Sequence, residues 1–165
     1  DWSSDVCSSD LWTNAPSKLL RAEVAAHADV AIYQAMASPR LEIKLAEATS
    51  LGGDVWKVRL GVANTGWLST TVTQHAKKMK IVLPAVVEIA GANGASLDIV
   101  EGEARVRIGQ LEGRSKVLLD GGAMSDGTTD RHLQTWVVRA KSGSVITLSA
   151  SHQRAGSVST TITLR

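Results

Sequence analysis

The chain has 165 residues and a formal net charge of +2, with 18 Lys and Arg residues against 16 Asp and Glu residues. Its basic residues are scattered rather than gathered on one segment with aromatic residues between them, which argues against a nucleic-acid-binding protein. No apolar run approaches the roughly 18 residues of a transmembrane helix, so we expect no membrane-spanning segment, and the length suits one ordinary domain plus a further element.

The first eleven residues, DWSSDVCSSDL, do not have the pattern of a folded protein segment. They resemble the conceptual translation of a sequencing-library adapter. We therefore expect residues 1–11 to be non-native, and residues 12–165 to be the C-terminal part of a longer protein. Cys7, the single cysteine, lies in this segment, so the native part offers no disulfide, no thiolate zinc site and no Cys nucleophile.

One amphipathic helix is predicted from Pro16 to Ser38. The segment is rich in Ala and Leu at helical spacing, Pro is favoured in the first turn, and Pro39 with its restriction on the preceding residue ends the helix. Residues 12–39 are interpreted as a helix left over from an upstream domain. Leu20, Val24 and Ile32 would then form an apolar stripe that packs between domains.

Residues 40–165 have the pattern of short strands, each bounded by turn residues. Strands are expected to begin at Leu41 and Val55, and further strands to span 81–89, 96–100, 104–111, 133–140, 145–151 and 158–164. The segment between Leu68 and Lys80 is too polar for a core strand and predicts a turn or short helix, and a long loop is expected from Asp120 to Arg131. Eight strands without intervening helices predict a mainly β fold, an antiparallel Greek-key sandwich of the immunoglobulin or fibronectin kind, after one N-terminal helix.

The histidines and acidic residues form no recognisable catalytic or metal motif. The four histidines lie at least 20 positions apart and none has a zinc-ligand spacing. His75 and His132 are expected in loops, where they could pair with Asp126 or Asp130, but no serine has the context of a nucleophile elbow. Asp126 and Asp130 also invite a calcium site, although Asx turns explain them more simply. We assign no catalytic residue and no metal ligand in this chain.

The tryptophans allow an alternative function. Exposed Trp rings could form a stacking platform for carbohydrate, but Trp56 and Trp136 lie within alternating strands, where core packing is the ordinary fate. Trp67 follows the turn Asn64-Thr65-Gly66 and is the candidate for an exposed binding aromatic. A non-catalytic module that binds carbohydrate or protein therefore remains open, whereas an enzyme in its own right is disfavoured.

A series of short motifs along the whole native part carries a family resemblance. They are Glu23, His27, Asp29, Ser38-Pro39-Arg40-Leu41-Glu42, Leu51-Gly52-Gly53-Asp54, Val62, Asn64-Thr65-Gly66-Trp67-Leu68, Thr70, Gly109-Gln110-Leu111-Glu112-Gly113-Arg114, Trp136-Val137-Val138-Arg139-Ala140 and Arg154-Ala155-Gly156. In this order they resemble the C-terminal region of bacterial carboxypeptidase A-like zinc metallocarboxypeptidases. One departure is Ser69, where the resemblance implies proline.

The resemblance implies a parent enzyme that removes C-terminal residues from peptides, with zinc held in an upstream catalytic domain of the same chain. It implies that the fragment is an accessory β-sandwich without a catalytic site or a cofactor of its own, and that the parent is secreted or periplasmic. The family's zinc ligands and general base match no position here, so no site residue is carried over. The partners implied are the upstream catalytic domain and, for the parent, a peptide substrate.

Overall fold

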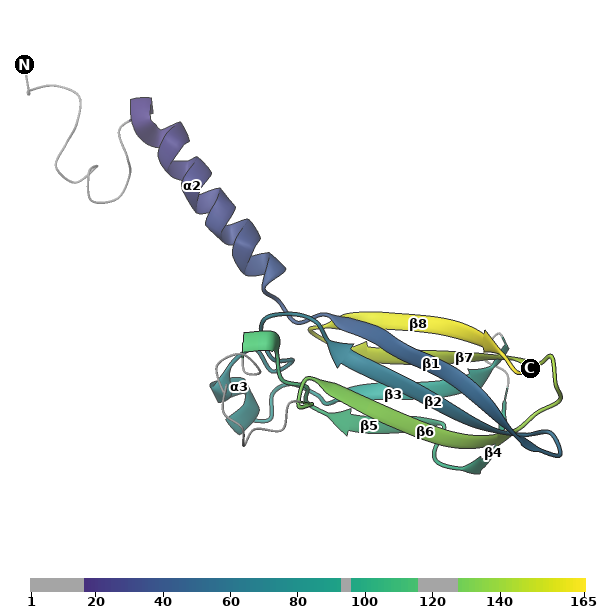
Figure 1. The fold of residues 1–165 in the computed structure, drawn as a ribbon. Coiled ribbons are helices and arrows are strands. Elements are labelled where there is room, and N and C mark those ends of the chain that lie inside the picture. The colour runs from purple at the N-terminus through teal and green to yellow at the C-terminus, as the bar shows by residue number, and fades with distance from the viewer. Residues whose placement is uncertain (1–16, 93–95, 116–127) are drawn as a thin grey trace, which may run out of the picture. The chain divides into compact units, whose positions relative to one another are not determined.

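A computed structural model describes residues 17–92, 96–115 and 128–165, and the chain divides into two units, residues 1–37 and Ser38–Arg165. Among these described residues, the first unit contributes a helix and the second contributes two antiparallel sheets (Figure 1). The fold is therefore mainly β with one N-terminal helix, as the strand pattern predicts.

The N-terminal helix, α2 (Ser17–Met36), has apolar and polar residues mixed around its axis rather than separated into two faces. An α-helix turns by about 100° per residue, so its exposed apolar side chains surround the axis instead of forming a stripe. These side chains are Leu19, Leu20, Val24, Val30, Ile32, Tyr33 and Met36. The prediction of an amphipathic helix is therefore wrong, because alanines supply much of the apolar spacing and alanine contributes little to a face. Among the described residues, no helix is long and apolar enough to cross a membrane.

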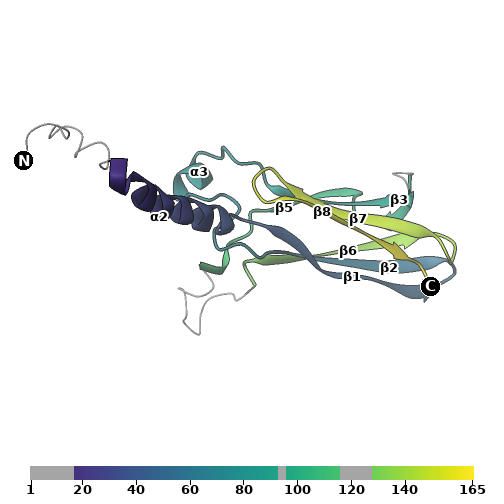
Figure 2. The same cartoon turned by 90° about the horizontal axis from the view of Figure 1, so that it is seen from above.

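The second unit is a sandwich of two four-stranded sheets, seen as two layers in Figure 2. One sheet has the order β1 (Leu41–Gly52), β2 (Val55–Asn64), β6 (Arg131–Arg139) and β4 (Asp98–Glu101). The other has the order β5 (Arg105–Gly109), β3 (Ala85–Gly91), β7 (Val145–His152) and β8 (Gly156–Thr163). From β2 to β7, each successive strand lies in the opposite sheet, so every connection between these strands crosses from one layer to the other.

The predicted inward face of β2 forms the centre of the core. Trp56, Val58, Leu60 and Val62 are all at most 4% exposed. They meet the apolar residues of the other strands, which include Trp136 and Val138 of β6 and Ile146 and Leu148 of β7. Both core tryptophans also satisfy their indole N–H groups, since Trp56 donates to the Ala140 carbonyl at 2.8 Å and Trp136 to the Glu103 carbonyl at 2.7 Å. Burial of alternate side chains thus sets the register of β2, as expected.

The strand expected over 81–89 begins only at Ala85. Pro84 precedes it and has no N–H to donate to a ladder, and Lys80 has a positive φ of 53° that interrupts an extended chain. Ile81 and Leu83 are consequently exposed. The preceding polar segment forms the short helix α3 (Gln74–Lys78), whose N-terminal N–H of Ala76 donates to the Thr73 hydroxyl at 3.1 Å. This matches the predicted turn or short helix.

Hydrogen exchange should separate the two units. A helix of this length is marginal in water without tertiary packing, and α2 by itself buries none of its apolar side chains. We expect the backbone amides of α2 to exchange much faster than those of β2 and β6, measured by mass spectrometry on the 165-residue chain. Protection of α2 equal to that of β2 would mean that another surface covers the helix.

Candidate functional site

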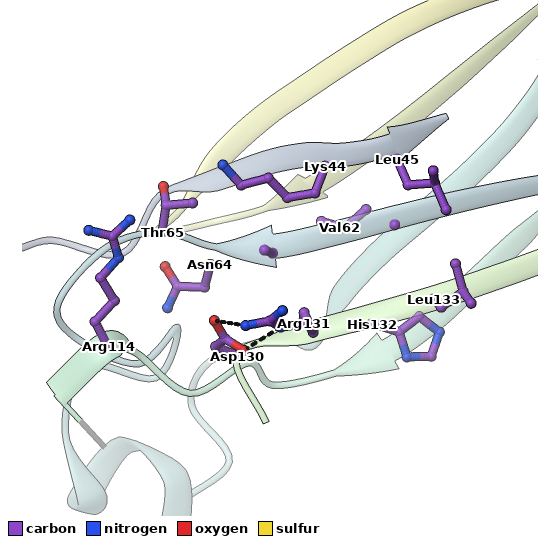
Figure 3. A pocket seen from close by; sticks show the side chains of 12 residues that line it. Lys44, Leu45, Val62, Asn64, Thr65, Arg114, Asp130, Arg131, His132 and Leu133 are labelled. Carbon is purple, nitrogen blue, oxygen red and sulfur yellow. Dashed lines mark hydrogen bonds and ion pairs between the residues drawn. The ribbon is translucent and has the colours of Figure 1, made fainter. Parts of the chain in front are cut away.

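A groove of about 790 Å³ lies on the sheet formed by β1, β2 and β6 (Figure 3). Its lining residues come from all three strands and from the segments that follow β2 and precede β6. They are Lys44, Leu45, Gly61, Val62, Ala63, Asn64, Thr65, Arg114, Asp130, Arg131, His132 and Leu133. This volume is in the usual range of small-molecule sites, about 300–1,000 Å³.

The floor of the groove is hollow because Gly61 has no side chain. Gly61 is paired with Leu45 on β1 and with Leu133 on β6, so an apolar residue stands on each side of it. A Cβ at Gly61 would lie 2.9 Å from the Cβ of Leu45, closer than two carbon atoms pack. A register shift between Ile43 and Leu45 leaves Lys44 without a cross-strand partner, which is the signature of a β-bulge. The glycine and the bulge together shape the floor.

The apolar floor is a local feature of this outer face. The next outward-facing row of cross-strand neighbours is polar. In this row Arg59 is paired with Glu47 on one side and with Thr135 on the other. The Arg59 guanidinium lies 3.2 Å from the Glu47 carboxylate. Leu133, in contrast, keeps 52% of its surface exposed. The groove is thus an apolar hollow bordered by charged side chains.

Asn64 fixes one end of the groove. It is fully buried, and its Oδ1 accepts hydrogen bonds from the N–H groups of Arg40 and Gly66 at 2.9 and 3.1 Å. Its Nδ2 donates to the carbonyls of Leu68 and Glu112 at 2.8 and 3.1 Å. One side chain therefore joins the end of β2 to three other segments, with all four of its hydrogen-bonding positions used.

The segment that carries Arg114 packs without space against the turn after β2. A Cβ at Gly113 would lie 2.2 Å from the carbonyl oxygen of Trp67, and a Cβ at Gly66 would lie 2.2 Å from that of Ser38. The backbone N–H of Arg114 donates to the Gly66 carbonyl at 3.1 Å. These contacts require glycine at both positions, and they hold the Arg114 backbone at the edge of the groove.

Three cations surround the groove, and two of them are paired. The Lys44 ammonium lies 2.5 Å from Glu42, and the Arg131 guanidinium donates to both carboxylate oxygens of Asp130, at 2.9 and 3.4 Å. Hydrogen bonds from Lys44 and from the Thr65 hydroxyl lower the pKa of Glu42 to about 2. The Asp130 carboxylate likewise raises the pKa of Arg131. Within the described part of the chain, the Arg114 side chain has no hydrogen-bond or ion-pair partner.

His152 is a buried titratable group outside the groove, at the end of β7. It is 6% exposed, and its Nδ1 accepts the N–H groups of Arg154 and Ala155 at 3.1 and 3.2 Å. The ring proton must therefore lie on Nε2. Burial lowers the pKa of His152. The Leu83 backbone partly opposes this shift, and the positive charge of Arg154 adds a smaller lowering.

Acid should weaken the sandwich through His152. The unfolded chain has a His pKa of about 6.5 and the folded pKa is lower, so the unfolded state binds more protons between these values. The contribution of His152 to the free energy of unfolding is therefore fully present above about pH 6.5. It falls, by at most about 1.4 kcal/mol per pH unit, as the pH drops from there through the folded pKa. Urea unfolding at pH 7.5 and 5 measures the loss. The variant His152→Asn should lose less stability between these pH values than the wild type. The control His75→Asn, at an exposed position, should lose as much as the wild type. Equal acid sensitivity of His152→Asn and the wild type would contradict this assignment.

The other residues considered from the sequence do not converge on a site. His75 lies in α3 and His132 in β6, not in loops, and His132 contacts Gln134 at 3.4 Å. Asp130 pairs with Arg131, whereas Asp126 and most of the predicted calcium loop lie outside the described residues. Across residues 17–92, 96–115 and 128–165, no three His, Cys, Asp or Glu side chains could hold a metal ion.

The tryptophans and the helix residues are placed as follows. Trp56 and Trp136 are core residues, as predicted, and Trp67 is 48% exposed, also as predicted. Trp67 is the one exposed tryptophan in the described ranges, so these ranges contain no platform of several Trp rings. Leu20, Val24 and Ile32 of α2 are 42%, 53% and 60% exposed. Their proposed packing between domains stays a prediction.

A match to a known protein family spans most of the chain. Residues 40–163 match the family described as Domain of unknown function (DUF8731). The chain belongs to this family. The DUF8731 match runs from just before β1 to the last residue of β8. The DUF8731 domain is therefore the sandwich and contains every lining residue of the groove, while α2 precedes it in the sequence. Among curated proteins, none matches the chain.

The groove of the DUF8731 domain was missed by sequence reasoning. One signal was available, since the outward positions of β2 change from Lys57 and Arg59 to Gly61 and Ala63, and a small residue at an outward position opens a hollow. The partners of Gly61 on β1 and β6 depend on strand pairing and register. Arg114 comes to the same edge through long-range contacts, which are the Asn64 bond to the Glu112 carbonyl and the bond of its own N–H to the Gly66 carbonyl.

Proposed function

We propose that the sandwich is a non-catalytic accessory domain of a zinc metallocarboxypeptidase, an enzyme that removes C-terminal residues from peptides. In this proposal the parent's zinc and catalytic residues belong to another domain; among the described residues, no three His, Cys, Asp or Glu side chains could hold a metal ion. The ordered motifs from Glu23 to Gly156 support the family, and the fold class agrees with an accessory sandwich.

The observation that carries the proposal is the composition of the α2 surface. A helix with apolar side chains on all sides is stable when other protein covers it, whereas a solitary surface helix has a polar face. Seven large apolar side chains of α2 are exposed in the helix by itself. The helix is therefore suited to packing against a larger catalytic domain, with the sandwich following it directly in the sequence.

The test begins with a long sequencing read of the source DNA through the codons of Leu11 and Trp12. We expect an upstream frame that encodes a His and Glu separated by two residues and a distant His. The protein expressed from that complete frame should bind zinc and release C-terminal residues from peptides. A start codon near Trp12, or a different upstream domain, would overturn the proposal.

A further inference from the structure

We propose that the groove on β1, β2 and β6 binds a small carboxylic acid with an apolar body. Figure 3 shows Arg114, Thr65 and Asn64 at one end of the groove and Leu45 and Leu133 at the other. The carboxylate would lie at the Arg114 end and the apolar body over Gly61. This binding activity goes beyond the accessory role and does not depend on it, because every residue involved belongs to the sandwich.

The charge pattern favours one negative charge on the ligand. Lys44 and Arg131 are each committed to a carboxylate of the chain, Glu42 and Asp130 respectively. Arg114 is exposed and has no partner in the described ranges, so its guanidinium is the cation left for a ligand. A guanidinium presents parallel N–H groups that match the two oxygens of a carboxylate. A phosphate, with its higher charge, would require cations that are already paired.

The backbone of Arg114 is held in place for this role. Its N–H bond to Gly66 and the Asn64 bond to the Glu112 carbonyl tie the segment to the end of β2. The side chain is thereby anchored at the groove while its guanidinium stays exposed. A fixed backbone reduces the ordering cost when the ligand binds.

The apolar end of the groove selects the body of the ligand. Leu45 and Leu133 stand on either side of Gly61, and the next position along β2 is the small residue Ala63. Leu133 is half exposed in the free protein, so an apolar group placed over Gly61 would remove its surface from water. A volume of about 790 Å³ exceeds what a bare anion needs. The site therefore fits a carboxylate attached to several carbon atoms.

Hexanoate is titrated into the 165-residue chain. Binding is measured by calorimetry and by the changes in the amide NMR signals of Gly61 and Leu133. We expect saturable binding of hexanoate. Acetate, which has the head group alone, and 1-hexanol and hexylammonium, which have the body without the negative charge, should bind at least about tenfold more weakly. Equal binding of hexanol and hexanoate would overturn the carboxylate assignment.

Matched variants locate the site. Arg114→Gln should weaken hexanoate binding by at least about tenfold, and Leu133→Ser by about fivefold. The controls are Arg107→Gln on β5 and Leu51→Ser in β1, both at exposed positions outside the groove lining, and both should bind as the wild type does. Thermal unfolding checks that each variant is folded. The changes in wild-type NMR shifts on addition of hexanoate locate the site without any substitution. Loss of binding in the control variants, or unchanged binding in Arg114→Gln, would refute the proposal.

A last comparison distinguishes a free acid from a peptide end. Acetyl-Ala-Leu and its amide are titrated under the same conditions as hexanoate. Affinities of the dipeptide acid no higher than that of hexanoate would support a free acid as the ligand. Binding of the dipeptide acid more than tenfold tighter than hexanoate, with loss of binding in its amide, would assign the groove to peptide C-termini and overturn the free-acid proposal.

Discussion

Replacing Asn64 by Asp is expected to destabilise the sandwich by about 3 kcal/mol or more. The Oδ1 bonds to the N–H groups of Arg40 and Gly66 could persist. The donor Nδ2, however, becomes an oxygen that faces the carbonyls of Leu68 and Glu112 at hydrogen-bond distance. Two partly buried acceptors lose their donor, and a carboxylate charge is placed at a position with no exposed surface. Desolvation and repulsion therefore act together.

Urea unfolding followed by circular dichroism measures this loss. Gln153→Glu is the matched control, because it makes the same change from amide to acid at an exposed position and should alter the free energy of unfolding by less than about 0.5 kcal/mol. Asn64→Ala, which removes the bonds without adding charge, should fall between the two. An Asn64→Asp variant as stable as Gln153→Glu would show that the hydrogen bonds of Asn64 do not hold the groove together.

The strand pattern was readable from the sequence because it is set by burial. The alternation from Trp56 to Val62 specifies which face of β2 enters the core, and the structure confirms it. The helix was harder to interpret, since alanine counts as apolar but contributes little to a face. The start of β3 was misplaced for a different reason. The apolar residues Ile81 and Leu83 suggest a strand, but Pro84 cannot pair and the ladder begins after it.

The groove depends on contacts that no local pattern reveals. The hydrogen bond from Asn64 to Glu112 joins residues 48 positions apart, and that from Asn64 to Arg40 spans 24 positions. Asn64-Thr65-Gly66 reads as an ordinary turn in the sequence, which is correct for the backbone but does not show that the Asn side chain is a junction. His152 is similar, because its burial follows from the β7–β8 hairpin and from Arg154 reaching the Thr71 carbonyl at 3.0 Å.

Trp136→Ala is expected to have the other large effect, a loss of about 3–5 kcal/mol in the free energy of unfolding. The ring has no exposed surface and lies in the core shared by both sheets. It also packs against Gly102, where a Cβ would lie 2.8 Å from the ring, and its N–H bond to the Glu103 carbonyl would be lost. The substitution leaves a cavity and an unsatisfied acceptor. Since small domains have only about 5–15 kcal/mol of stability, this loss would remove a large share of it.

Trp67→Ala is the matched control, because the same atoms are removed at a position that is 48% exposed. We expect it to cost about 1 kcal/mol or less, with an unchanged dependence on urea concentration. The difference between the two variants decides how the tryptophans are used. A large cost at Trp136 alone means that the core tryptophan supports the sheet that carries the groove, while Trp67 is free to contact other molecules. Similar large costs at both positions would make Trp67 a structural residue and would remove it as a candidate binding aromatic.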